Sequence, residues 1–175
     1  MDKISVEYQV TVSDFRQATY FGLFQRHRMA LRIMFVVLIV SVLYVLGANI
    51  GLGTMNPLVL FIAAAYLIWG LLLFAGAEKG IRQYLRSEGS LIGCSFRAEL
   101  ESHRIRLEIP ERKIQVTTQT NQLACVFELS SLFMIYVSAQ DVYLLPHRCL
   151  TDAQRVALRQ NFREKLGEKF SSRFK

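Results

Sequence analysis

The sequence lacks charge over a long internal stretch, since no Asp, Glu, Lys or Arg occurs between Arg32 and Glu78. The chain as a whole is not poor in charge, because charged residues make up 20% of it and hydrophobic residues 52%. The apolar residues are therefore concentrated in the block 33–77. A helix that crosses a bilayer needs about 20 predominantly apolar residues, so this block indicates membrane-spanning segments.

Cysteine and histidine are also scarce. The cysteines Cys94, Cys125 and Cys149 lie far apart and form neither a zinc-binding pair nor a disulfide framework, so we expect reduced thiols in a cytoplasmic compartment. The three histidines lack metal-ligand spacing, and no P-loop, HExxH, GxSxG or paired-carboxylate pattern occurs. His147 and a cysteine form the one conceivable catalytic pair, but no third group stands out to orient the histidine. We expect no enzyme, no metal and no cofactor.

The uncharged block is too long for one helix. At about 1.5 Å per residue, a continuous helix over 33–77 would be roughly 67 Å long, more than twice the ~30 Å hydrocarbon thickness of a bilayer. Residues that end helices and permit turns cluster in its middle. They are Gly47, Asn49, Gly51, Gly53, Thr54, Asn56 and Pro57. This cluster predicts a first span near 30–50, a second near 57–77 and a short loop between them.

Basic residues flank the predicted spans on one side only. They are Arg26, His27, Arg28 and Arg32 before the first span and Lys79, Arg82 and Arg86 after the second. Cytoplasmic loops carry an excess of Lys and Arg, so both termini are expected in the cytoplasm. The block 33–77 contains no Asp, Glu, Lys, Arg or His, which disfavours an ordinary channel or pump.

Small residues recur within the two predicted spans. Ala63, Gly70 and Ala77 are seven residues apart, and Gly47 with Gly51 forms a GxxxG pattern. Small residues let helices approach closely. Two interpretations remain open, in which these residues either pack the two spans against each other or form a homodimer.

In the remainder of the chain, apolar and polar residues alternate as they do in β-strands. Residues 4–12 form one predicted strand, after which Ser13 and Asp14 favour the start of a helix that continues over 15–27. Residues 78–86 read as a continuation of the second span. The further predicted strands are 94–100, 104–109, 113–119, 123–129, 132–138 and 142–145. Strands at this spacing indicate an antiparallel sheet or a small barrel.

The last segment predicts a helix that begins at Thr151 or Asp152. Its apolar stripe consists of Leu158, Phe162, Leu166 and Phe170, and its candidate contacts with an anionic surface are Arg155, Arg159, Lys165 and Lys169. The helix either packs on the sheet, with the stems of its cations covering the edge of the core, or binds an anionic membrane surface.

The predicted organisation is an α+β membrane protein in three parts. Residues 1–28 hold the N-terminal strand and a juxtamembrane helix, 29–86 the transmembrane hairpin, and 87–175 a cytoplasmic strand-rich domain closed by the C-terminal helix. Because the N-terminal strand lies on the same side of the membrane as the others, it can join their sheet. The hairpin would then be an insertion into a single domain.

Two segments carry a resemblance to a known family. Ser5–Phe15 (SVEYQVTVSDF) resembles the opening of the YcxB-like family of bacterial membrane proteins, and Leu145, Pro146, Arg148 and Leu150 match the strand-to-helix segment near that family's end. The resemblance implies a pleckstrin-homology-like sheet capped by a C-terminal helix, in a bacterial inner membrane. It implies no reaction, because the function of that family is unknown.

These patterns favour a membrane-anchored cytoplasmic module that binds protein partners or anionic lipid headgroups. The alternative is an accessory subunit of a larger membrane assembly, in transport or a stress response. The expected partners are the lipid bilayer and either a second copy of the chain or another membrane protein. Nucleic acid is disfavoured although the net charge is +7, because the basic residues lack interleaved aromatic platforms. Arg148 is expected to reach solvent or a phosphate.

Overall fold

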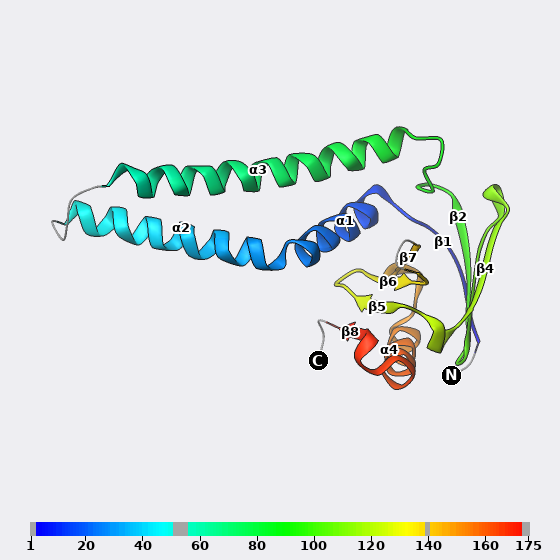
Figure 1. Cartoon of the computed structure of the whole chain (residues 1–175). Helices are drawn as coiled ribbons and strands as arrows, with labels where there is room; N and C mark the ends of the chain where they lie inside the picture. Colours follow the sequence, from blue (N-terminus) through cyan, green and yellow to red (C-terminus); the bar gives the residue numbers. More distant parts are fainter. Residues whose placement is uncertain (1–2, 51–55, 139–140, 173–175) are drawn as a thin grey trace. The chain divides into compact units, whose positions relative to one another are not determined.

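The computed structural model of the chain describes residues 3–50, 56–138 and 141–172 (Figure 1). The protein is of the α+β class and divides into two compact units. One unit combines Met1–Ala18 with Gly89–Lys175, and the other is Thr19–Glu88. The second unit is therefore an insertion into the first along the chain.

The inserted unit is helical. It contains the second half of α1 (Val12–Arg26), then α2 (Arg28–Asn49) and α3 (Pro57–Arg86), and α2 and α3 lie side by side (Figure 1). The side chain of Asn56 caps α3 by accepting a hydrogen bond from the backbone N–H of Leu58 at 2.9 Å. Proline at the next position has its φ already suited to a helix and its missing N–H is not needed there.

The predicted helices of this unit are confirmed. The first predicted span matches α2, and the second, together with its continuation over 78–86, forms the single helix α3. Gly51, Gly53 and Thr54 of the predicted turn lie outside the described residues.

The first sheet contains the N-terminal strand. Its antiparallel order is β1 (Ile4–Gln9), β2 (Ser95–Leu100), β3 (Arg104–Ile109) and β4 (Ile114–Gln119). Pairing of β1 with β2 confirms that the N-terminal strand joins strands from beyond the helical unit. Apolar residues alternate along the strands onto one buried face, where the rings of Tyr8 and Phe96 stack with centroids 5.5 Å apart.

The second sheet differs from the single antiparallel sheet or barrel that the spacing predicted. Its order is β7 (Val142–Pro146), β6 (Leu132–Tyr136), β5 (Cys125–Glu128) and β8 (Phe170–Ser172), with β8 parallel to β5. The structure thus has two four-stranded sheets among its described residues. In the part of the chain that the structure describes, four short 3-10 helices connect elements, namely η1 (Pro110–Arg112), η2 (Thr120–Gln122), η3 (His147–Cys149) and η4 (Gly167–Lys169).

The C-terminal helix α4 (Asp152–Leu166) is shorter than predicted. Thr151 is its cap, in a reciprocal pair of hydrogen bonds with Gln154. The helix ends at Gly167, whose φ of +54° suits glycine and turns the chain out of the helix. The prediction that Phe170 continues the apolar stripe was therefore wrong, because Phe170 lies in β8, opposite Val126.

The other three residues of that stripe pack into the core. Leu158, Phe162 and Leu166 are buried, and the ring of Phe162 lies 5.9 Å from that of Phe133 and 6.0 Å from that of Phe170. The predicted packing of this stripe on a sheet is thus confirmed for these three residues.

The predicted start of α1 was wrong by two residues. Thr11, and not Ser13, caps this helix. Its backbone N–H donates to Asp14 at 2.8 Å, and the backbone N–H of Asp14 donates to the Thr11 hydroxyl at 3.3 Å. This reciprocal pair satisfies two amides that the first turn would otherwise leave unbonded, so the helix begins earlier and the strand ends at Gln9.

Candidate functional site

The faces that α2 and α3 turn toward each other are closely packed. Leu31, Met34 and Ser41 are buried on α2, and Gly70 is buried on α3. A Cβ atom added at Gly70 would lie 3.0 Å from the sulfur of Met34, which is tighter than ordinary van der Waals contact. Glycine at this position therefore lets the two helices approach closely.

The remaining predicted packing residues differ in their surroundings. Ala63 and Ala77 are half-buried on α3, on the same face as Gly70. Gly47 on α2 would meet nothing within 4 Å if a Cβ were added, and Gly51 lies outside the described residues. Gly70 is thus the residue of this set for which the structure shows a close contact.

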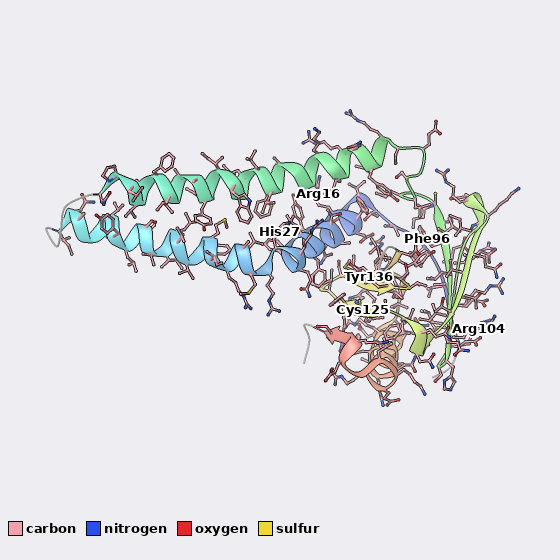
Figure 2. All side chains as sticks on the ribbon, viewed as in Figure 1. Arg16, His27, Phe96, Arg104, Cys125 and Tyr136 are labelled. Atoms are coloured by element: carbon pink, nitrogen blue, oxygen red, sulfur yellow. The ribbon has the colours of Figure 1, made fainter. Side chains whose placement is uncertain are left out.

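The outer faces of the same two helices are apolar and exposed. Both helices are long and apolar enough to cross a membrane. Within the apolar stretch of 18 residues in each helix, however, only 17% of the residues are buried in α2 and 11% in α3. The side chains project outward along both helices (Figure 2). Those at least 60% exposed are Met29, Leu43, Ile50, Leu58, Phe61, Leu71 and Leu72. A helix of a soluble core would have such side chains covered.

Cations and aromatic rings gather toward one end of the helix pair. Exposed cations flank the apolar stretches at Arg26, Arg28, Arg32, Lys79, Arg82 and Arg86. Next to them the Tyr20 hydroxyl donates to Glu78 at 2.7 Å, and the rings of Tyr20 and Phe24 lie about 6 Å from that of Phe74 (6.0 and 5.9 Å). The first carboxylate after the uncharged block is therefore hydrogen-bonded.

Two of the four cations predicted to contact an anionic surface are engaged within the sheet unit. Arg159 binds Glu128 through two hydrogen bonds, the one from its Nε measuring 2.7 Å, and the Glu128 side chain has no exposed surface. Arg155 pairs with Asp152 at 3.0 Å, whereas Lys165 and Lys169 are exposed. We therefore assign Arg159 to the interior of the fold, where its charge offsets that of a buried carboxylate.

Glu128 lies at the centre of this buried ion pair. Burial alone would raise the pKa of its carboxyl, but hydrogen bonds from Arg159 and Ser172 and the charge of Arg159 outweigh that effect and lower the pKa. The carboxylate therefore stays ionised inside the core. Sequence reasoning missed this pair, because Glu128 occupies a strand position that local alternation does not distinguish from its neighbours.

A second ion pair joins α1 to η3. Arg148 donates to both carboxylate oxygens of Asp14, at 2.9 and 2.7 Å, and to the Gln9 carbonyl at 2.7 Å. The prediction that Arg148 reaches solvent is confirmed in part, because its side chain is 49% exposed although its guanidinium binds Asp14 and Gln9. Contact with a phosphate stays a prediction. Burial would raise the pKa of Asp14, but the bonds from Arg148 and Thr11 prevail and lower it.

The histidine and cysteine weighed as a catalytic pair have structural surroundings. The ring of His147 lies edge-on to Phe133 with centroids 4.7 Å apart, and burial lowers its pKa. The thiol of Cys149 donates to the Pro146 carbonyl at 2.8 Å, and burial raises its pKa to about 11. Such a thiol is protonated at neutral pH and therefore a poor nucleophile. In the described part of the chain, no group of three or more His, Cys, Asp or Glu could hold a metal ion.

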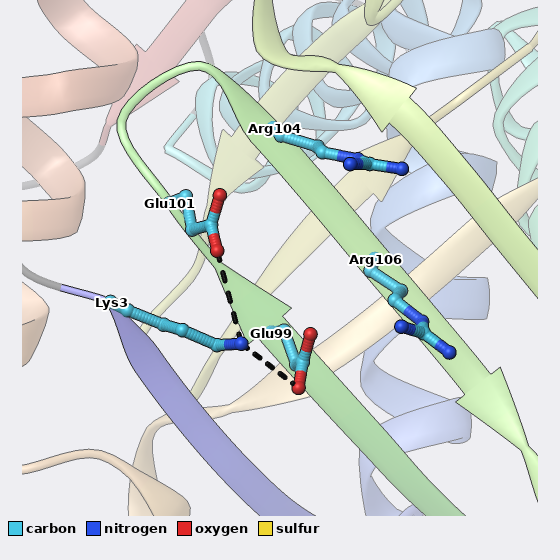
Figure 3. Close-up of a pocket in the computed structure, with 5 residues that line it drawn as sticks. All are labelled: Lys3, Glu99, Glu101, Arg104 and Arg106. Atoms are coloured by element: carbon cyan, nitrogen blue, oxygen red, sulfur yellow. Dashed lines mark ion pairs between the residues drawn. The ribbon is translucent and has the colours of Figure 1, made fainter.

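The exposed face of the first sheet carries a small charged hollow of about 220 Å³ (Figure 3). Lys3 pairs there with Glu99 at 3.2 Å and with Glu101 at 3.9 Å, while Arg104 and Arg106 stand beside them on β3. The hollow has both signs of charge, so its charges favour neither an anionic nor a cationic ligand. The exposed apolar helix pair with its basic end is therefore the strongest candidate site.

Comparison with known proteins found no relative of the chain. No family model matches the chain, and neither does any curated protein or solved structure.

Proposed function

We propose that the chain is a membrane-anchored interaction module, in which α2 and α3 cross a bilayer as a hairpin. The observation that supports this proposal is the apolar surface that both helices leave exposed. In their apolar stretches of 18 residues, only 17% of the residues of α2 and 11% of those of α3 are buried. Exposed apolar surface costs about 25 cal/mol per Å² in water, and lipid removes that cost.

The lengths of the helices support the same proposal. The 22 residues of α2 are about 33 Å long at 1.5 Å per residue, close to the ~30 Å hydrocarbon thickness. On α3, the part from Pro57 to Ala77 has about the same length before Glu78 begins the polar end. Each helix can therefore cross the hydrocarbon region once.

The charges favour one orientation. The exposed cations lie at the ends of α2 and α3 that connect to the sheet unit along the chain, so by the positive-inside rule that unit and both termini are cytoplasmic. The aromatic rings of Tyr20, Phe24 and Phe74 suit the boundary between lipid and water. The sheet unit would then act on that side by binding a protein partner or lipid headgroups.

We also propose that the chain is related to the YcxB-like family. Four antiparallel strands, three further antiparallel strands and a closing helix support the pleckstrin-homology-like arrangement that the resemblance implies. A bacterial inner membrane is the location that follows from it.

Fractionation and a reporter test the anchor and its orientation. The full chain should stay in the membrane pellet after alkaline extraction, as an integral protein does. Alkaline phosphatase, which is active only outside the cytoplasm, should be silent when fused after residue 175 and active when inserted at residues 51–55. Release of the chain by alkali, or activity of the terminal fusion, would overturn the proposal.

A second candidate function rests on the same exposed apolar surface. In an accessory subunit of a larger membrane assembly, part of that surface would contact another membrane protein. Replacing 33–77 with an unrelated two-span hairpin discriminates the two. The interaction module should keep its activity and its co-purifying partners, whereas an accessory subunit should lose them.

A further inference from the structure

The outward face of α3 changes from apolar to cationic along one line. Ile68, Leu71 and Leu72 are 58%, 68% and 65% exposed. Further along the helix, Lys79, Arg82 and Arg86 are exposed and recur at spacings of three and four residues, which places them on one face. At 100° per residue this is the same face as the exposed apolar residues.

The cationic half of this face is open to solvent. Ala75, Glu78, Gln83 and Ser87 lie around the three cations at the C-terminal end of α3. Glu78 is the one acid in this group, and its carboxylate accepts a hydrogen bond from Tyr20. The side chains of Lys79, Arg82 and Arg86 form no ion pair or hydrogen bond with any residue that the structure describes. This face therefore presents three positive charges that have no partner among the described residues.

We propose that this face of α3 binds an anionic phospholipid, with the phosphate at Lys79, Arg82 and Arg86 and an acyl chain along Ile68, Leu71 and Leu72. This inference rests on the proposed membrane anchor. Arginine and lysine donors match a phosphate, and Gln83 and Ser87 offer further hydrogen bonds to a headgroup.

The apolar half of the face selects a lipid over a free anion. Leu72 and Lys79 are about 10 Å apart along the helix axis, at 1.5 Å per residue. A phospholipid offers the same order of groups, with its phosphate above and its acyl chain below. Inorganic phosphate or a soluble acidic peptide would meet the cations but leave Ile68, Leu71 and Leu72 uncovered.

Fluorescence quenching in vesicles tests this site on the full chain. Trp69 is the single tryptophan and lies on α3 beside the apolar half of the site. In phosphatidylcholine vesicles, a minor fraction of brominated phosphatidylglycerol should quench Trp69 more than the same fraction of brominated phosphatidylcholine. Each cation near an anionic lipid contributes about a fivefold preference. The triple variant Lys79→Gln, Arg82→Gln, Arg86→Gln should therefore lose on the order of a hundredfold in relative affinity.

A matched variant separates the site from net charge. Arg104→Gln, Lys113→Gln, Arg163→Gln removes the same charge from exposed positions of the sheet unit and should keep the preference. Excess inorganic phosphate should not displace the lipid. Equal quenching by both brominated lipids would contradict the proposed site. The same loss of preference for phosphatidylglycerol in both triple variants would also contradict it. A chain that fails to enter vesicles at all shows instead that the proposed anchor is wrong, and flotation of the vesicles reports that outcome separately.

Discussion

At the scale of single residues, two ion pairs that each hold a buried carboxylate stabilise the sheet unit. Glu128 with Arg159 and Asp14 with Arg148 each join segments far apart along the chain. Breaking such a pair by removing one partner leaves a charge in the core, which costs far more than an exposed pair contributes. These residues are therefore the most sensitive charged positions of the fold.

Arg159→Ala should destabilise the second sheet by about 3 kcal/mol, because it leaves the Glu128 carboxylate buried without its cation. Amide hydrogen exchange in β5 and β8 measures this effect locally. The matched variant Lys165→Ala, at an exposed position of the same helix, should change stability by less than about 0.5 kcal/mol. Similar exchange rates in the two variants would contradict this role of Arg159.

The sheet unit should lose stability in two steps as the pH falls. Folding lowers the pKa of His147 and of the carboxyls of Asp14 and Glu128, so in each case the native state binds fewer protons than the unfolded state. The stabilisation from His147 is present above about pH 6.5 and is lost below it, and that from the carboxyls is lost below about pH 4.

The melting temperature of the full chain in detergent, followed by circular dichroism across this pH range, measures both steps. His147→Gln should remove the step near neutrality and leave the acid step. Identical pH profiles for the two proteins would show that His147 contributes nothing to the first step.

At the scale of elements, local patterns predicted most of the fold. The uncharged block and its cluster of turn residues predicted α2 and α3, and period-two alternation predicted β1 to β7, because both signals lie within each segment. Phe170 was misassigned because its spacing from Leu166 fits a helix, and a three-residue strand has no period of its own. The ion pair of Arg159 could not be predicted for a related reason, since its partner Glu128 lies on another element and leaves no trace in local spacing.

The packing of α2 on α3 should depend on Gly70. Gly70→Ala should be tolerated, because the Met34 thioether that its Cβ meets can move. Gly70→Leu should force the helices apart and cost about 1–3 kcal/mol. Thermal unfolding in detergent provides the measurement, with Gly47→Leu as the control, since that position has open space around it. If both leucine variants lost the same stability, the close contact between the helices would not be at Gly70.

At the scale of the whole molecule, the helical unit interrupts a sheet that is complete without it. The chain leaves the first unit after Ala18 and returns at Gly89, and the Gly93 N–H donates to the Val10 carbonyl at 3.2 Å. The two ends of the interruption are thus held close to each other by the first unit itself.

Replacing 19–88 with a flexible Gly/Ser linker should therefore yield a water-soluble protein that keeps both sheets. Circular dichroism and dispersed NMR amide signals would measure its folding. A further variant of it that lacks residues 1–10 should lose the edge strand β1 and unfold at a lower temperature. A linker protein that is unfolded or aggregated would show that the sheets need the helical unit.

The pairing of β1 with β2 also sets an order of events during synthesis. Gln9 leaves the ribosome long before its partner Ser95, and at about 5–20 residues per second the delay is on the order of ten seconds. During that time β1 has no strand to pair with, while α1, α2 and α3 are completed. The first sheet can consequently be completed only after the helical unit has been synthesised, so a ribosome that stalls within 19–88 holds a nascent chain whose first strand is still unpaired.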